Sequence, residues 1–222
     1  MNRLFVVLGW IISIAIPLFL IMTAVWLLLN PLYLEYQYNR PGFPPDPYGF
    51  SVEQRLHWGK LSLEYLLIDA DITFLADLEF EDGTPLFNQR ELIHMYDVRV
   101  VVQNMLSVWR AVGVGLLVLG IWAWRVGWLR GFWNSVSRGG FITVALLLAI
   151  LLLVFVSFNA LFDAFHRIFF EYNTWTFLLS DTLIRLFPLP LWQDAFLFTG
   201  AFSLVAGMVL GLVGRALARR GA

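Results

Sequence analysis

The chain has 222 residues, of which 59% are hydrophobic and only 14% are charged. A soluble domain carries about a quarter charged residues, so this composition predicts a protein surrounded by lipid. The net charge of −1 and the absence of a long basic run exclude a nucleic-acid-binding tail. No cysteine is present, which excludes disulfides, thiolate metal ligands and a thiol nucleophile.

Four long apolar stretches predict four transmembrane helices, because a helix needs roughly 20 residues to cross the hydrocarbon core. The expected spans are residues 4–29, 103–124, 141–162 and 195–214. The second span is the least regular, since its uncharged part is only 14 residues long and must extend through Arg110. We therefore expect a membrane all-α fold, in which residues 1–29 and 98–222 form a four-helix transmembrane bundle.

The distribution of charge predicts the orientation, because positively charged segments remain in the cytoplasm. Seven arginines and no acid flank the spans on one side: Arg3, Arg125, Arg130, Arg138, Arg215, Arg219 and Arg220. All 16 acidic residues fall in the other two connecting segments, 30–97 and 163–194. We therefore expect both termini in the cytoplasm, with residues 30–97 as an extracytoplasmic cap and 163–194 as a second extracytoplasmic segment.

The cap 30–97 is expected to be a small α+β unit. Ser51 and Gln54 form a capping-box pattern, which predicts a helix over about 52–68. The alternating pattern in 78–87, interrupted by an Asp-Gly turn, predicts a β-hairpin.

A second capping-box pattern, Asn88 and Glu91, precedes the second span. The helix that it starts is expected to continue into the membrane, with Glu91, His94 and either Asp97 or Val98 on one face.

In the segment 163–194, Asp163 and His166 lie three residues apart where the third span ends. Asp181 is expected to start a short helix and to pair with Arg185 four residues later. Pro188 then ends this helix.

All three histidines lie in the expected extracytoplasmic segments. His57 is expected to be an ordinary surface residue, whereas His94 and His166 each have a carboxylate three residues away, Asp97 and Asp163. Such a neighbour fixes the tautomer of the ring and raises its basicity. The alternative is that both are interface histidines in salt bridges. A zinc site is not expected, because no HExxH or similar spacing occurs.

Arg110 is the one charged residue within an expected span, and such residues are functional candidates. It is expected either to line a groove and pair with a lipid head group or carbonyl, or to extend its side chain to the interface.

Two stretches resemble a known family. They are 90–99, RELIHMYDVR, and 165–188, which contains FHRIFF, Asn173-Thr174-Trp175 and DTLIRLFP. Both resemble motifs of the bacterial lipoprotein intramolecular transacylase (Lit) family, in order and in placement beside the second and third spans. The resemblance extends over the whole four-span layout.

The resemblance implies an enzyme of the bacterial cytoplasmic membrane, with its site on the extracytoplasmic side and no cofactor. It would move the sn-2 acyl chain of a diacylglyceryl-cysteine lipoprotein onto the α-amine of the same cysteine, giving a lyso-form lipoprotein. Its partners would be the diacylated lipoprotein N-terminus and membrane lipid. The implied residues are His94 and His166 in catalysis; Asp97, Asp163, Glu91 and Asp181 in support; and Arg110, Asn173, Trp175 and Arg185 in substrate positioning.

This chemistry suits the available side chains. An α-amine titrates near 8, so a histidine can act as the base that prepares it for attack. Because amine and ester belong to one molecule, no acyl-enzyme is required. Two alternatives remain open: a non-enzymatic membrane scaffold that binds a partner through its cap, and a metal-dependent lipid hydrolase.

Overall fold

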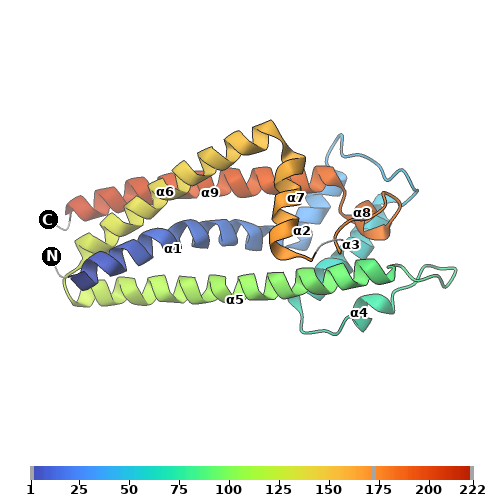
Figure 1. The fold of residues 1–222 in the computed structure, drawn as a ribbon, viewed down its shortest axis with the longest axis horizontal. Helices are drawn as coiled ribbons and strands as arrows, with labels where there is room; N and C mark the ends of the chain where they lie inside the picture. Colours follow the sequence, from blue (N-terminus) through green and yellow to red (C-terminus); the bar gives the residue numbers. More distant parts are fainter. Residues whose placement is uncertain (1–2, 172–173, 221–222) are drawn as a thin grey trace. The chain divides into compact units, whose positions relative to one another are not determined.

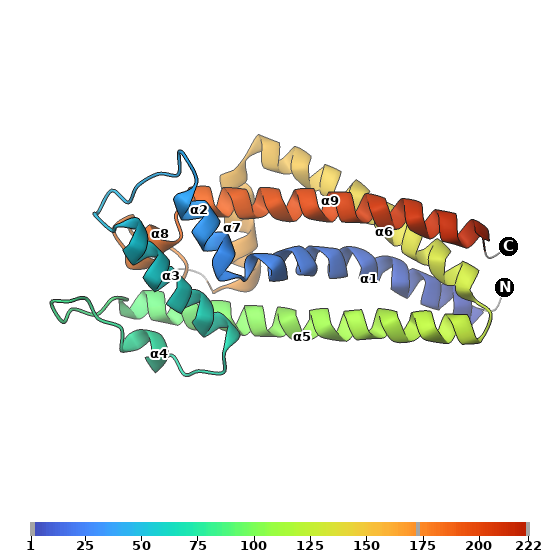
Figure 2. The same ribbon diagram turned by 180° about the vertical axis from the view of Figure 1, so that it is seen from behind.

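The computed structural model describes residues 3–171 and 174–220. Within these ranges the chain forms nine helices and no strand (Figures 1 and 2). They are α1 (Arg3–Leu28), α2 (Pro31–Asn39), α3 (Val52–Leu67), α4 (Thr73–Ala76), α5 (Gln89–Arg125), α6 (Leu129–Val156), α7 (Phe158–Phe169), α8 (Thr182–Leu186) and α9 (Leu189–Arg220).

Four of these helices are long and apolar enough to cross a membrane, as predicted. They are α1, α5, the part Leu129–Leu151 of α6, and α9. The apolar run 141–162, expected as one span, is divided between α6 and α7, because the helix is interrupted at Ser157. His166 consequently lies on a separate helix of 12 residues.

The chain divides into two compact units. The helix bundle comprises Met1–Leu27, Leu106–Ser157 and Phe196–Ala222, and the cap unit comprises Leu28–Met105 and Phe158–Ala195. The segments 30–97 and 163–194 both fall within the cap unit.

Glycines allow α6 and α9 to pack closely in the helix bundle, where the two helices run antiparallel (Figure 1). A Cβ atom on Gly140 would lie 2.4 Å from the Gly207 carbonyl oxygen, and one on Gly214 would lie 2.9 Å from the Trp133 carbonyl oxygen. Small residues at a membrane-helix interface permit this approach of backbones. A buried cluster on α1, α5 and α6 completes the bundle core: Ile12, Ile16, Leu20, Ala123, Phe132 and Val136.

The cap unit confirms one predicted element and corrects another. Helix α3 begins after Ser51, whose hydroxyl accepts from the Gln54 amide while the Gln54 side chain accepts from the Ser51 amide. The predicted β-hairpin is wrong: only an isolated bridge joins Glu79 and Pro85. Pro85 has no amide hydrogen to donate, so the pairing does not extend into strands. The described cap is helical, and the expected α+β cap is not found.

Candidate functional site

The first turn of α5 is fixed by the predicted capping box. The Asn88 amide donates to Glu91 Oε2 at 2.8 Å, and the Glu91 amide donates to Asn88 Oδ1 at 3.1 Å. Glu91 is only 1% exposed, and its Oε1 also accepts a 2.6 Å hydrogen bond from the Leu183 amide. Leu183 lies in the first turn of α8, where amides lack partners within the helix. The carboxylate of Glu91 therefore caps α8 as well as α5.

His94 follows Glu91 by three residues and is 7% exposed. Its ring centre lies 4.8 Å from that of Phe170 and 5.3 Å from that of Phe177. The buried Nδ1 atom has no hydrogen-bond partner. Leaving a buried ring nitrogen without a hydrogen-bond partner costs free energy of folding, so such atoms are rare in an ordinary core. Nδ1 of His94 is therefore available to hydrogen bond to a ligand.

His166, on α7, is half-buried. Its Nδ1 lies 2.8 Å from the Phe162 carbonyl oxygen, one turn earlier on the helix. A carbonyl only accepts, so Nδ1 carries the proton and, in the neutral ring, Nε2 keeps its lone pair. Burial lowers the pKa of His166 below the ordinary value of 6.5, while the Phe162 carbonyl and the charge of Asp163 oppose this effect.

The two histidines lie together. Their ring centres are 6.2 Å apart and their planes are inclined by 20°. The ring of Trp175 lies 4.9 Å from that of His166, and its buried Nε1 has no hydrogen-bond partner. The site thus contains two ring nitrogens without hydrogen-bond partners: Nδ1 of His94, within the pair of imidazoles, and Nε1 of Trp175, beside His166.

The expected carboxylate partners do not hydrogen bond to the histidines in the described part of the chain. Asp163 acts on His166 through its charge alone, and His94 Nδ1 is without a partner, so Asp97 does not orient it through that atom.

Asp181 has a different role from the one expected. Its carboxylate accepts from Arg90 at 3.2 Å and from the Leu178 amide at 2.8 Å. The predicted pair with Arg185 is wrong, because Arg185 donates through two nitrogens to Asp46, at 3.0 and 2.9 Å. The pair Arg90–Asp181 instead connects α5 to the loop that carries Trp175.

The other expected positioning residues lie elsewhere or outside the described residues. The guanidinium of Arg185 also packs 3.4 Å from the ring centre of Phe50, which gives it a place in the cap core. Arg110 belongs to the helix bundle, and its Nε donates to the Leu106 carbonyl at 3.1 Å. Asn173 lies outside the described residues.

Three aromatic residues around the histidines were not predicted: Phe162, Phe170 and Phe177. The chain contains 20 phenylalanines, so residue type alone does not distinguish them. The described residues contain no group of three or more histidine and carboxylate side chains that could hold a metal ion.

These features define a membrane protein of four apolar helices with a pair of adjacent histidines, one buried and one half-buried, among aromatic side chains. The family model of lipoprotein intramolecular transacylase Lit matches residues 10–192. The chain belongs to this family.

The chain is also similar to individual proteins. A protein of Aquifex aeolicus (strain VF5) is 31% identical over 186 residues, which cover 82% of this chain and 83% of that one. The membrane-integral lipoprotein intramolecular transacylase Lit from Bacillus cereus has a similar fold, with a TM-score of 0.74 at 17% identity, over 99% of this chain and 98% of that one. A variant of the same enzyme with one histidine replaced by arginine gives a TM-score of 0.74 at 16% identity, over 98% and 93% of the two chains.

Proposed function

We propose that this protein is a lipoprotein intramolecular transacylase, in which His94 and His166 move the sn-2 acyl chain of a diacylglyceryl-cysteine onto the α-amine of the same cysteine. The observation that carries the proposal is the pair of imidazoles 6.2 Å apart, one buried and one half-buried, inside a chain of the Lit family. Both rings lie in the cap unit, which also carries every acidic residue of the chain.

His166 is the proposed base. With its Nδ1–H directed at the Phe162 carbonyl, the free Nε2 accepts a proton from the attacking amine. The depressed pKa keeps the ring neutral, and therefore able to accept that proton, at neutral pH. Since the α-amine titrates near 8, a base is needed to supply its neutral form.

The amine nitrogen then attacks the sn-2 ester carbonyl, forming the C–N bond of the amide. The C–O bond to glycerol breaks, and the departing oxygen takes up a proton. His94, buried beside the His166 ring that now carries the amine proton, is proposed to be neutral and to pass that proton to the departing oxygen, one of its ring nitrogens accepting a proton while the other donates one. Both rings are neutral again after the step. The reaction consumes one amine N–H and one ester, and it yields one amide and one hydroxyl.

Trp175 is proposed to stabilise the negative oxygen of the tetrahedral intermediate. Its indole nitrogen can only donate, and as a buried donor without a partner it suits a developing oxyanion. Glu91 and Asp181 are proposed to position the site. Glu91 binds α8 to α5 through the Leu183 amide, and Asp181 binds the loop of Trp175 to α5 through Arg90. Asp97 and Asp163 are proposed to support the two histidines through their negative charge, and Asn173 is proposed to position the substrate.

We further propose that the site faces the extracytoplasmic side of the bacterial cytoplasmic membrane. The arginine-rich helix bundle termini would then lie in the cytoplasm, following the positive-inside rule. An outer site meets the lipoprotein N-terminus, which is anchored in the outer leaflet of that membrane.

The test uses a bacterial host that lacks this activity, with lipoprotein N-termini analysed by mass spectrometry. The intact protein should give lyso-form lipoprotein with an N-acyl chain, and His94→Ala and His166→Ala should each remove at least 99% of it. His57→Ala is the matched control, because His57 is exposed and its ring contacts that of Trp58, which is not part of the proposed site. Normal N-acylation by both site variants would refute the catalytic roles of the two histidines. No N-acylation with the intact protein would support the scaffold alternative, and loss of an acyl chain without N-acylation would support a hydrolase.

A further inference from the structure

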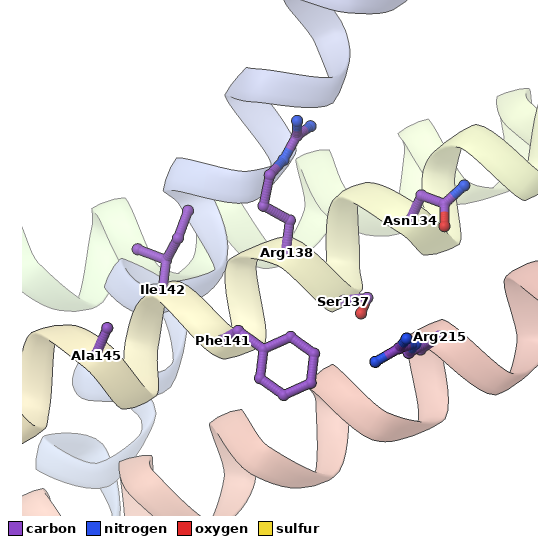
Figure 3. A pocket seen from close by; sticks show the side chains of 7 residues that line it. All are labelled: Asn134, Ser137, Arg138, Phe141, Ile142, Ala145 and Arg215. Carbon is purple, nitrogen blue, oxygen red and sulfur yellow. The ribbon is translucent and has the colours of Figure 1, made fainter.

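A shallow groove lies between α6 and α9 in the helix bundle (Figure 3). Its volume is about 530 Å³, within the range of ligand sites. The groove is lined by Asn134, Ser137, Arg138, Phe141, Ile142, Ala145 and Arg215. It belongs to the helix bundle alone and contains none of the residues assigned to the acyl transfer.

The bundle has positive charge and no negative charge of its own. Its sequence segments contain eight arginines and neither aspartate nor glutamate: Arg3, Arg110, Arg125, Arg130, Arg138, Arg215, Arg219 and Arg220. No aspartate or glutamate side chain within the bundle can therefore balance these guanidinium groups. Anionic head groups of membrane lipids carry the complementary charge.

The two arginines of the groove differ in their surroundings. Arg138 is held by α1: its Nε donates to Ser13 Oγ at 2.9 Å, and its guanidinium lies 4.1 Å from the ring centre of Trp10. Figure 3 shows its side chain directed toward α1. Arg215 is exposed, forms no salt bridge with the described residues, and extends beside Ser137 and Phe141 (Figure 3).

The groove changes from polar to apolar along α6. Asn134, Ser137 and Arg138 come first, and Phe141, Ile142 and Ala145 follow. These residues extend over about 16 Å of helix axis at the rise of an α-helix. Ser137 already donates to the Gly211 carbonyl at 2.7 Å. Because the Arg138 side chain is directed toward α1 (Figure 3), the donors that remain on the α9 side of the groove are Arg215 and the Asn134 amide.

From this arrangement we infer that the groove binds the phosphate of an anionic membrane lipid. Arg215 and Asn134 donate to the phosphate oxygens, while an acyl chain lies along Phe141, Ile142 and Ala145. Guanidinium groups form strong charge-assisted hydrogen bonds with phosphate, and basic pockets between membrane helices are known positions for anionic head groups. The inference does not depend on the proposed acyl transfer.

The experiment measures the thermal unfolding midpoint of the full chain in neutral detergent while one of three probes is added. The probes are phosphatidylglycerol, phosphatidylcholine and inorganic phosphate. Phosphatidylcholine has the same phosphate group, but its quaternary ammonium group cancels the negative charge. A ligand that binds only the folded state raises the midpoint. Phosphatidylglycerol should give a saturable increase, and the other two probes should give little or none. An equal response to phosphatidylcholine would overturn a role for anionic charge, and an equal response to inorganic phosphate would overturn a lipid ligand.

Variants separate a built site from general surface charge. Arg215→Gln should weaken the apparent phosphatidylglycerol affinity at least tenfold, and Asn134→Ala should weaken it to a smaller extent. Arg220→Gln is the matched control, because it removes the same charge from α9 but lies on a different face of the helix, five residues away. Equal losses in Arg215→Gln and Arg220→Gln would overturn the inference. Both arginines are exposed, so neither substitution should prevent folding.

Discussion

Replacing Glu91 by alanine tests the support of the site, because this buried carboxylate caps two helices. The Leu183 amide would lose its 2.6 Å acceptor, and the N-cap residue Asp181 supplies no side-chain hydrogen bond in its place. A buried donor left without a partner costs about 1–3 kcal/mol. The Asn88 amide also loses its acceptor, but Asn88 is exposed, and water can replace that bond.

This cost can be measured locally by hydrogen–deuterium exchange. A loss of about 1–3 kcal/mol corresponds to exchange of the Leu183 amide that is faster by about 5-fold to 150-fold. Glu91→Gln keeps one acceptor oxygen and should show a smaller increase. Glu64→Ala is the control, since Glu64 is an exposed acid on α3 and its loss should leave Leu183 unchanged. Unchanged exchange in Glu91→Ala would refute the capping role.

Three further predictions concern packing, protonation and the cap core. Gly140→Ala places a methyl group 2.4 Å from a backbone oxygen of α9, so it should destabilise the bundle by about 1–3 kcal/mol in a detergent unfolding titration. Gly115→Ala is the control, because nothing lies within 4 Å of its added Cβ atom, and it should be neutral or stabilising. Equal effects of the two substitutions would contradict the packing account. Nitrogen NMR should find the His166 ring mostly neutral at pH 6.5 and protonated only at lower pH. The free energy of unfolding should fall as the pH drops below 6.5, because the ring binds a proton more readily in the unfolded chain. A titration midpoint of His166 at or above pH 6.5 would refute this prediction. Arg185→Ala should lower the stability of the cap by about 2 kcal/mol or more, because the Asp46 side chain, only 1% exposed, loses both charged hydrogen bonds. An unchanged unfolding midpoint would contradict this prediction.

The parts of the fold that depend on local sequence were predictable. Hydropathy identified the four membrane helices, and the capping boxes at Ser51 and Asn88 identified the starts of α3 and α5. Both signals arise within a few residues of one another along the chain. The prediction of a β-hairpin failed for an equally local reason, because Pro85 has no amide hydrogen to donate to a strand ladder.

Long-range partners were not predictable. Arg185 was expected to pair with Asp181, four residues away, but Asp181 binds Arg90 and Arg185 binds Asp46. The cap of α8 comes from Glu91, which is 92 residues away in the chain. Helical periodicity ranks only near neighbours, so it cannot identify such partners.

The candidate site shows the same division. The sequence singled out His94 and His166, and the structure brings their rings together, while their catalytic roles remain predictions. The interruption at Ser157, which gives His166 a helix of its own, lies in an apolar run with no proline or glycine to indicate it. The free Nε1 of Trp175 is a feature of burial that only the structure gives.

The most direct test of intramolecular acyl transfer is a crossover experiment with purified protein. A diacylglyceryl-cysteine peptide, labelled in both its sn-2 chain and its peptide, is mixed with the same unlabelled molecule. Mass spectrometry of the N-acylated lyso product should then find only doubly labelled and unlabelled species, and the product should be absent with His94→Ala and His166→Ala. Products that combine a labelled chain with an unlabelled peptide, or free fatty acid without N-acylation, would contradict the proposed reaction.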